Sequence, residues 1–184
     1  RAARRRQVAV SAAGIRLIVN ADDFGLSQAI NHGVVAAHRD GIVTSPSVMV
    51  NGPAFDDAVA LAAQNPALDI GVHLTLTELA PLASRERVSS LLGPDGRFPP
   101  HAIDFAHRYL RGAVRLAEVR TELDAQIRLA KSRGPAVSHL DSHQHVHVLP
   151  GIARVVAELA REHGIRAVRF PRERLQAYML ANMR

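Results

Sequence analysis

The stretch that decides the fold is residues 15–25, IRLIVNADDFG, in which a mostly apolar run ends abruptly at two aspartates and a glycine. The apolar part predicts a buried strand at 15–20, and the polar part predicts a loop at the carboxyl end of that strand. Ser27 is then placed to cap a helix that ends near residues 40–41. This order of strand, polar loop and helix is the start of a βα unit.

The same order repeats along the chain. Further strands are predicted at 42–50, 68–77, 136–140 and 165–170, and further helices begin at residues 53, 116, 150 and 175. Strands that alternate with helices favour an α/β fold of parallel strands with right-handed crossovers. Five strands are too few to close a barrel, so the pattern predicts an open sheet or part of a longer chain.

Residues 78–101 interrupt this pattern with proline, glycine and charged residues. Loops of this length are usually functional lids or mobile surface segments, and the sequence leaves both interpretations open.

Composition excludes several classes of protein. With 184 residues, 47% of them hydrophobic and 22% charged, the chain is not disordered, and we expect one domain over residues 15–184. The absence of cysteine excludes disulfide scaffolds, thiolate zinc sites and cysteine nucleophiles. No apolar run approaches the roughly 20 residues of a membrane span, so a cytoplasmic protein is expected.

The net charge of +6 does not indicate nucleic-acid binding. Four arginines lie in residues 1–14, which we expect to form a basic, flexible N-terminal segment, and the remainder carries 19 − 17 = +2. Aromatic residues are only 4% of the chain and tryptophan is absent, whereas nucleic-acid-binding proteins combine a basic face with aromatic side chains.

A histidine cluster follows the fourth predicted strand. Four of the ten histidines lie in residues 139–147, HLDSHQHVH, and share odd parity with Asp141. An extended backbone would point these side chains to one side, which favours a metal site over a chance collection of exposed histidines. His73 alternates with apolar residues on the third strand and shares its polar face with Thr75 and Thr77, so that face is expected to line a cavity.

Asp22 and Asp23 are either an acidic turn or part of the same site. Adjacent carboxylates repel each other and are costly to bury, and a cation offsets both effects. One carboxylate then binds the metal while its neighbour faces water bound to that metal. One aspartate and two histidines with open positions are typical of a catalytic site. Nucleophile-elbow, phosphate-loop and dinucleotide motifs are absent, which leaves metal-assisted hydrolysis.

Three segments carry a resemblance to a known family: residues 17–27 (LIVNADDFGLS), 71–77 (GVHLTLT) and 139–147 (HLDSHQHVH). In this order they resemble the YdjC-like carbohydrate deacetylases, and the resemblance covers residues 16 to about 171. It implies a distorted, seven-stranded, TIM-like (β/α) barrel that continues beyond residue 184. The family's candidate general acid, a histidine, belongs to that later part, and His163, predicted within a helix, is a poor substitute.

The resemblance also implies a ligand set and a reaction. Asp23, His73 and His143 would hold one divalent metal, and Asp22 would be the general base. The reaction is hydrolysis of the acetyl group from an N-acetylglucosamine-type sugar, either an oligosaccharide or a glycolipid head group. Mg²⁺ is the metal implied by the family, although two imidazoles suit Zn²⁺, Co²⁺ or Mn²⁺ better.

The remaining residues of the motifs would support that set. Asp141, His145 and His147 would orient the ligands or face the substrate. Arg169, at the end of the fifth strand, would orient Asp22 or lie on the surface.

Two other functions stay open. A phosphoesterase could use the same ligands, although such enzymes often need two metals and convincing ligands are present for one. A sugar-binding protein without catalysis is the other alternative. A homo-oligomer is compatible with each of these functions, the deacetylase included.

Overall fold

A computed structural model describes residues 16–134 and 136–171 of the chain. One parallel sheet contains five strands, in the order β1-β2-β3-β4-β5. The strands are β1 (Asn20–Phe24), β2 (Ser45–Val48), β3 (Gly71–Leu74), β4 (His139–Ser142) and β5 (Ala167–Val168). The helices are α1 (Gln28–Arg39), α2 (Phe55–Gln64), α3 (Ala102–Leu110), α4 (Leu116–Arg133) and α5 (Pro150–Glu162).

The predicted α/β class with parallel strands is therefore confirmed. Successive strands are neighbours throughout the sheet, so the strand order has no reversal of the kind that defines a doubly wound sheet. A closed seven-stranded barrel remains a prediction, because the described residues contain five strands. The predicted segment at residues 1–14 and the helix predicted to begin at 175 lie outside the described residues.

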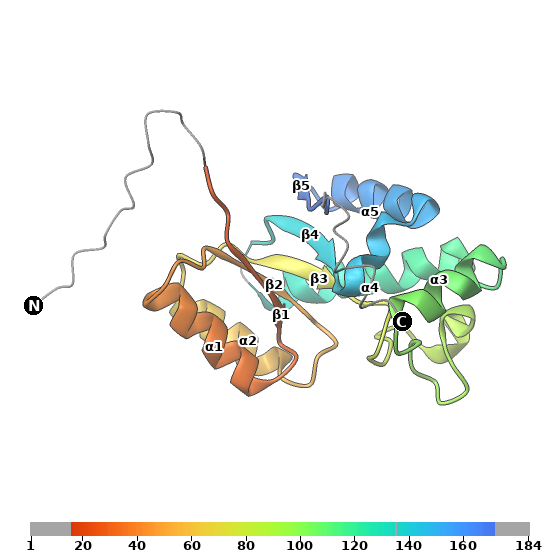
Figure 1. The fold of residues 1–184 in the computed structure, drawn as a ribbon, viewed down its shortest axis with the longest axis horizontal. Coiled ribbons are helices and arrows are strands. Elements are labelled where there is room, and N and C mark those ends of the chain that lie inside the picture. The colour runs from red at the N-terminus through yellow and green to blue at the C-terminus, as the bar shows by residue number, and fades with distance from the viewer. Residues whose placement is uncertain (1–15, 135, 172–184) are drawn as a thin grey trace, which may run out of the picture.

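The helices pack in two pairs along the sheet. α1 and α2 lie side by side next to the first strands, whereas α4 and α5 pack together beside β3 and β4 (Figure 1). Ser27 caps α1 as predicted, because its hydroxyl accepts a hydrogen bond from the Ile30 N–H at 3.2 Å. Among the helices within residues 16–134 and 136–171, none combines the length and the apolar character needed to cross a bilayer.

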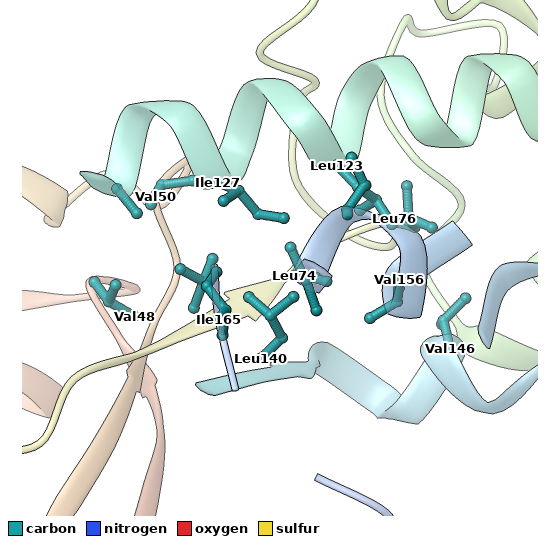
Figure 2. Close-up of a cluster of buried hydrophobic side chains, with 14 of the residues drawn as sticks. Val48, Val50, Leu74, Leu76, Leu123, Ile127, Leu140, Val146, Val156 and Ile165 are labelled. Carbon is teal, nitrogen blue, oxygen red and sulfur yellow. The ribbon is translucent and has the colours of Figure 1, made fainter. Parts of the chain in front are cut away.

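The core lies between the sheet and these helices. Figure 2 shows Leu123 and Ile127 of α4 directed at Leu74 of β3 and Leu140 of β4, with Val156 of α5 beside them. All five side chains are almost fully buried. Because successive side chains of a strand point to opposite faces, the residues that alternate with this apolar set lie on the other face of the sheet.

The first strand differs from its predicted position. It runs over 20–24 rather than 15–20, so Asp22 and Asp23 lie on the strand itself and not in a loop. Its register against β2 shifts between Ala21 and Phe24, and Asp23 has φ 64°. A bulge of this kind turns a strand side chain to a new direction. Leu17 and Ile18, which suggested burial, are 73% and 72% exposed.

The prediction that the side chains of the histidine cluster all point to one side is wrong for the residues after the strand. β4 runs over 139–142 rather than 136–140, and the 3₁₀ segment η3 (His143–Val148) follows it directly. Gln144 and His145 have φ of 52° and 56°, in the left-handed region. The backbone therefore stops alternating at the point where the parity argument required it to continue.

The segment 78–101 is packed against the rest of the molecule. It contains the 3₁₀ turns η1 (Arg85–Arg87) and η2 (Ser89–Leu91), and Val88, Leu91 and Phe98 are buried in the core. The carboxylate of Glu122, on α4, accepts hydrogen bonds from the backbone N–H groups of residues 82 and 83 at 3.0 and 2.9 Å. Helix α3, which the sequence did not predict, follows this segment.

Candidate metal centre

The candidate site lies at the carboxyl ends of β1, β3 and β4. The structure brings together Asp23, His73 and His143, the three residues named from the sequence. Asp23 Oδ1 lies 3.3 Å from His73 Nε2 and 2.9 Å from His143 Nδ1. The two imidazole rings are 5.6 Å apart between centroids and inclined at 70°. Three potential ligand atoms from three separate segments therefore converge on one point.

His73 is held on the polar face of β3 by Asp141 of β4. Its Nδ1–H donates a hydrogen bond to Asp141 Oδ1 at 2.7 Å, and both side chains are buried. Burial lowers the pKa of His73, but hydrogen bonds to Asp141 and Asp23 outweigh it and raise that pKa to about 9. The Asp141 contact leaves Nε2 facing Asp23, so the ring orientation is fixed before any cation arrives.

The electrostatics of Asp23 and His143 follow from their mutual contact. Hydrogen bonds from His143 and His73 hold the pKa of Asp23 well below its ordinary value. The bond to Asp23 in turn raises the pKa of His143. Asp23 is thus ionised, as a carboxylate ligand requires.

Asp22 lies beside the ligand set without joining it. Its Oδ1 accepts hydrogen bonds from Arg169 Nη1 and from Asn20 Nδ2, both at 2.7 Å. Arg169 Nη1 also lies 3.2 Å from Asp141 Oδ2. The guanidinium therefore bridges Asp22 and Asp141, which places Arg169 at the site rather than on a remote surface.

His145 and His147 occupy different positions from the ligands. His147 is buried between β4 and β5: its Nδ1 accepts from the Ser142 hydroxyl at 2.5 Å, and its Nε2–H donates to the Arg169 carbonyl at 2.8 Å. Burial lowers the pKa of His147, which agrees with a neutral ring. The contact to Arg169 ties η3 to the residue that follows β5. His145 Nδ1 is buried without a hydrogen-bond partner among the described residues.

His163 is occupied elsewhere. It caps the end of α5 and its Nε2 lies 2.7 Å from Asp124 Oδ1 on α4.

Three residues of the site were missed from the sequence: Asn20, which donates to Asp22, and also Ser47 and Glu78. Ser47 of β2 donates a hydrogen bond to Asp141 Oδ2 at 2.8 Å, and Glu78 places Oε2 3.5 Å from His143 Nε2. For Ser47 a signal existed, because Ser45 and Ser47 share parity within an otherwise apolar strand. For Glu78 no spacing signal existed, since it begins the irregular segment 78–101.

The residues present fit a divalent cation. The site contains four carboxylates, from Asp22, Asp23, Asp141 and Glu78, and one guanidinium, so with neutral imidazoles its formal charge is −4 + 1 = −3. Two imidazole nitrogens and one carboxylate oxygen form an N₂O donor set, which suits a transition metal or zinc.

A second group of potential ligands does not make an independent site. Asp22, His73 and Asp141 also have ligand atoms close together, but they share His73 with the first group. The Arg169 guanidinium already bridges their two carboxylates. The geometry therefore favours one cation rather than two.

These features define a class of protein: a parallel α/β sheet with a candidate single-cation site at its carboxyl edge. The family model for YdjC-like proteins matches residues 16–184. The chain therefore belongs to the YdjC-like family, as its three motifs indicated.

Named relatives are similar over most of this chain. The carbohydrate deacetylase of Brevibacillus brevis is 43% identical over 157 residues, which cover 85% of this chain and 60% of that protein. The carbohydrate deacetylase of Homo sapiens is 43% identical over 162 residues, or 87% of this chain and 50% of that protein. The chain thus spans half to three fifths of the length of these relatives.

A solved structure agrees with the fold. The crystal structure of an Enterococcus faecalis V583 protein, described as a cellobiose-phosphate cleavage protein, matches with a TM-score of 0.76 at 37% identity. The match covers 85% of this chain and 59% of that one.

Proposed function

We propose that the protein is a metal-dependent hydrolase that removes the acetyl group from an N-acetylated sugar of the N-acetylglucosamine type. The observation that carries this proposal is the convergence of Asp23 Oδ1, His73 Nε2 and His143 Nδ1 beside a carboxylate, Asp22, that stays outside the ligand set. The names of the relatives, carbohydrate deacetylases, supply the class of substrate.

In this proposal Asp23, His73 and His143 hold one divalent cation. When bound, such a cation lowers the pKa of a water toward about 7 and polarises the acetyl carbonyl. The N₂O donor set favours Zn²⁺, Co²⁺ or Mn²⁺, while Mg²⁺, which prefers oxygen ligands, is the metal that the family resemblance implies.

Asp22 is the proposed general base. Hydrogen bonds from Arg169 and Asn20 fix its carboxylate, which is 37% exposed and therefore open to the substrate side. It takes a proton from the attacking water as the water oxygen bonds to the acetyl carbon. The carbon–nitrogen bond then breaks, acetate leaves, and the sugar amine takes up a proton. A positioned base of this kind contributes roughly 10²–10⁴-fold in rate.

The test combines metal analysis with acetate release from N-acetylglucosamine conjugates. Asp22→Asn should retain the metal and lose at least about 100-fold in turnover, because only the base is removed. His143→Ala should lose both metal and activity. Asp104→Asn, an exposed acid on α3, is the matched control and should change neither.

Each alternative has its own signature in that assay. An Asp22→Asn variant with normal turnover would exclude Asp22 as the base. Protein that binds metal and sugar yet releases no acetate would indicate a sugar-binding role, and phosphate release from a sugar phosphate would indicate a phosphoesterase.

A further inference from the structure

We propose that Glu78 is the carboxylate that positions His143, in the way that Asp141 positions His73. This inference deepens the proposed function, since it rests on the same metal centre. It has a specific consequence: the two histidines present opposite ring nitrogens to the cation, Nε2 from His73 and Nδ1 from His143.

The contacts of the two rings carry the assignment. In His73, Nδ1 is bonded to Asp141 at 2.7 Å, which leaves Nε2 to face Asp23. In His143 the pattern is reversed, because Nδ1 lies 2.9 Å from Asp23 Oδ1. Nδ1 is therefore the His143 nitrogen at the point where the ligand atoms converge.

The other nitrogen of His143 needs an acceptor. When Nδ1 serves as a ligand, the ring proton must lie on Nε2, which is buried and has no hydrogen-bond partner among the described residues. A buried N–H without an acceptor is unfavourable. Glu78 Oε2 lies 3.5 Å away, at ion-pair distance, and its side chain is exposed enough to adjust. Metal-bound histidines commonly donate their second N–H to such a carboxylate.

The surroundings of Glu78 hold it in this place. Its φ is 64°, a backbone conformation that is uncommon for residues other than glycine and is often found at functional sites. Its N–H donates to the Pro99 carbonyl and its own carbonyl accepts from Arg97 Nη2, both at 2.9 Å. Gln144, next to His143, donates to Glu78 Oε1 at 2.6 Å and leaves Oε2 for the imidazole.

Two measurements on purified protein test the assignment without using activity. The first is the affinity for Zn²⁺ alone, by competition with a chromophoric chelator. Glu78→Ala should bind Zn²⁺ about 10- to 100-fold more weakly. Glu78→Gln should lose less, because its amide oxygen still accepts a hydrogen bond from Nε2. Glu86→Gln, an exposed glutamate of the same segment, is the control and should match the unmodified protein.

The second measurement is a long-range ¹H–¹⁵N spectrum of the histidine rings in zinc-loaded protein. It should show zinc on Nε2 of His73 and on Nδ1 of His143. Coordination of His143 through Nε2 would overturn the proposal, as would an unchanged Zn²⁺ affinity in Glu78→Ala.

The measurements distinguish a failure of the proposed function from a failure of this inference. Protein that binds zinc with the expected pair of nitrogens but releases no acetate would contradict the hydrolase and leave the role of Glu78 standing. Protein that binds no divalent metal would overturn both.

Discussion

Replacing Asp141 by asparagine should weaken metal binding without changing the size of the side chain. The carboxylate takes part in three polar contacts: His73 Nδ1 at 2.7 Å, Ser47 Oγ at 2.8 Å and Arg169 Nη1 at 3.2 Å. Asparagine offers one oxygen and one NH₂ group in place of two oxygens. The NH₂ must then face either Arg169, another donor, or His73 Nδ1, which would have to become an acceptor.

Each of these orientations of the asparagine amide weakens metal binding or lowers the free energy of unfolding. If the NH₂ faces His73, the ring proton moves to Nε2, the nitrogen assigned to the cation, and must be displaced there. If it faces Arg169, two donors oppose each other and a buried hydrogen bond is lost, at a cost of about 1–3 kcal/mol in the free energy of unfolding. We expect about 10- to 100-fold weaker metal binding, which corresponds to about 1.4–2.7 kcal/mol.

The assay is a Co²⁺ or Zn²⁺ titration of Asp141→Asn, together with urea unfolding of the metal-free protein. Asp57→Asn is the matched control, because that carboxylate also accepts a short hydrogen bond, from Asn31 Nδ2 at 2.7 Å, but lies outside the ligand group. Metal affinity equal to that of the unmodified protein would refute the reasoning, since Asp141 would then not orient His73.

Two further predictions concern stability. Gly71→Ala would place a Cβ 2.2 Å from the His139 ring, so urea unfolding should show a loss of about 1–3 kcal/mol. Gly33→Ala, in α1 with open space around it, should cost nothing, and equal effects of the two variants would be inconsistent with the clash. Burial raises the pKa of Asp124, but hydrogen bonds, chiefly from Arg128, outweigh it and lower that pKa. The ionised Asp124 carboxylate therefore stabilises the folded protein. This stabilisation is complete above about pH 4 and is lost as the pH falls through the lowered pKa of Asp124. Asp124→Asn should therefore be less stable than the unmodified protein at neutral pH, and the difference should shrink as the pH falls below about 4, whereas a constant difference would contradict this.

The alternation of strands and helices could be predicted because it depends on local patterns. These patterns are the apolar runs, Ser27 at the start of α1 and Gly134 at the end of α4. Each of them favours a strand or bounds a helix through residues that are close in sequence. The bounds of β1 could not be predicted, because they are set by pairing with β2, where Asn20 lies opposite Ser45. The run 15–20 is apolar, yet its Leu17 and Ile18 are exposed, so composition alone misplaced the strand.

The candidate site shows the same division. Asp22, Asp23, His73 and Asp141 lie on strands, so knowledge of the sheet was enough to bring them together. The side-chain directions after residue 142 depend on two residues with left-handed backbone conformations. Alternation along a strand does not account for such residues. Glu78 is held at the site by contacts with Arg97 and Gln144, which lie 19 and 66 positions further along the chain. Contacts between residues so far apart produce no periodic pattern in the sequence.

The helix α3 was missed for a related reason. Its first backbone N–H, of Ala102, donates to the side chain of Gln144 at 2.5 Å, and Phe105 anchors it in the core. Both contacts are tertiary, and a helix of nine residues is too short to be stable from local propensity alone.

The polar face of the sheet explains why the site is largely formed before a cation binds. Parallel strands are usually apolar on both faces, but here the face opposite α4 and α5 carries a continuous set of hydrogen bonds. Asn20 donates to Ser47, Ser47 donates to Asp141, and Asp141 accepts from His73, so side-chain hydrogen bonds link β1 to β2, β2 to β4 and β4 to β3. His143 differs, since it lies on η3 beyond the strand. Asp23 and His73 are thus the rigid part of the ligand set, whereas His143, held through Gln144 and Glu78, is the ligand whose position a variant outside the sheet can change.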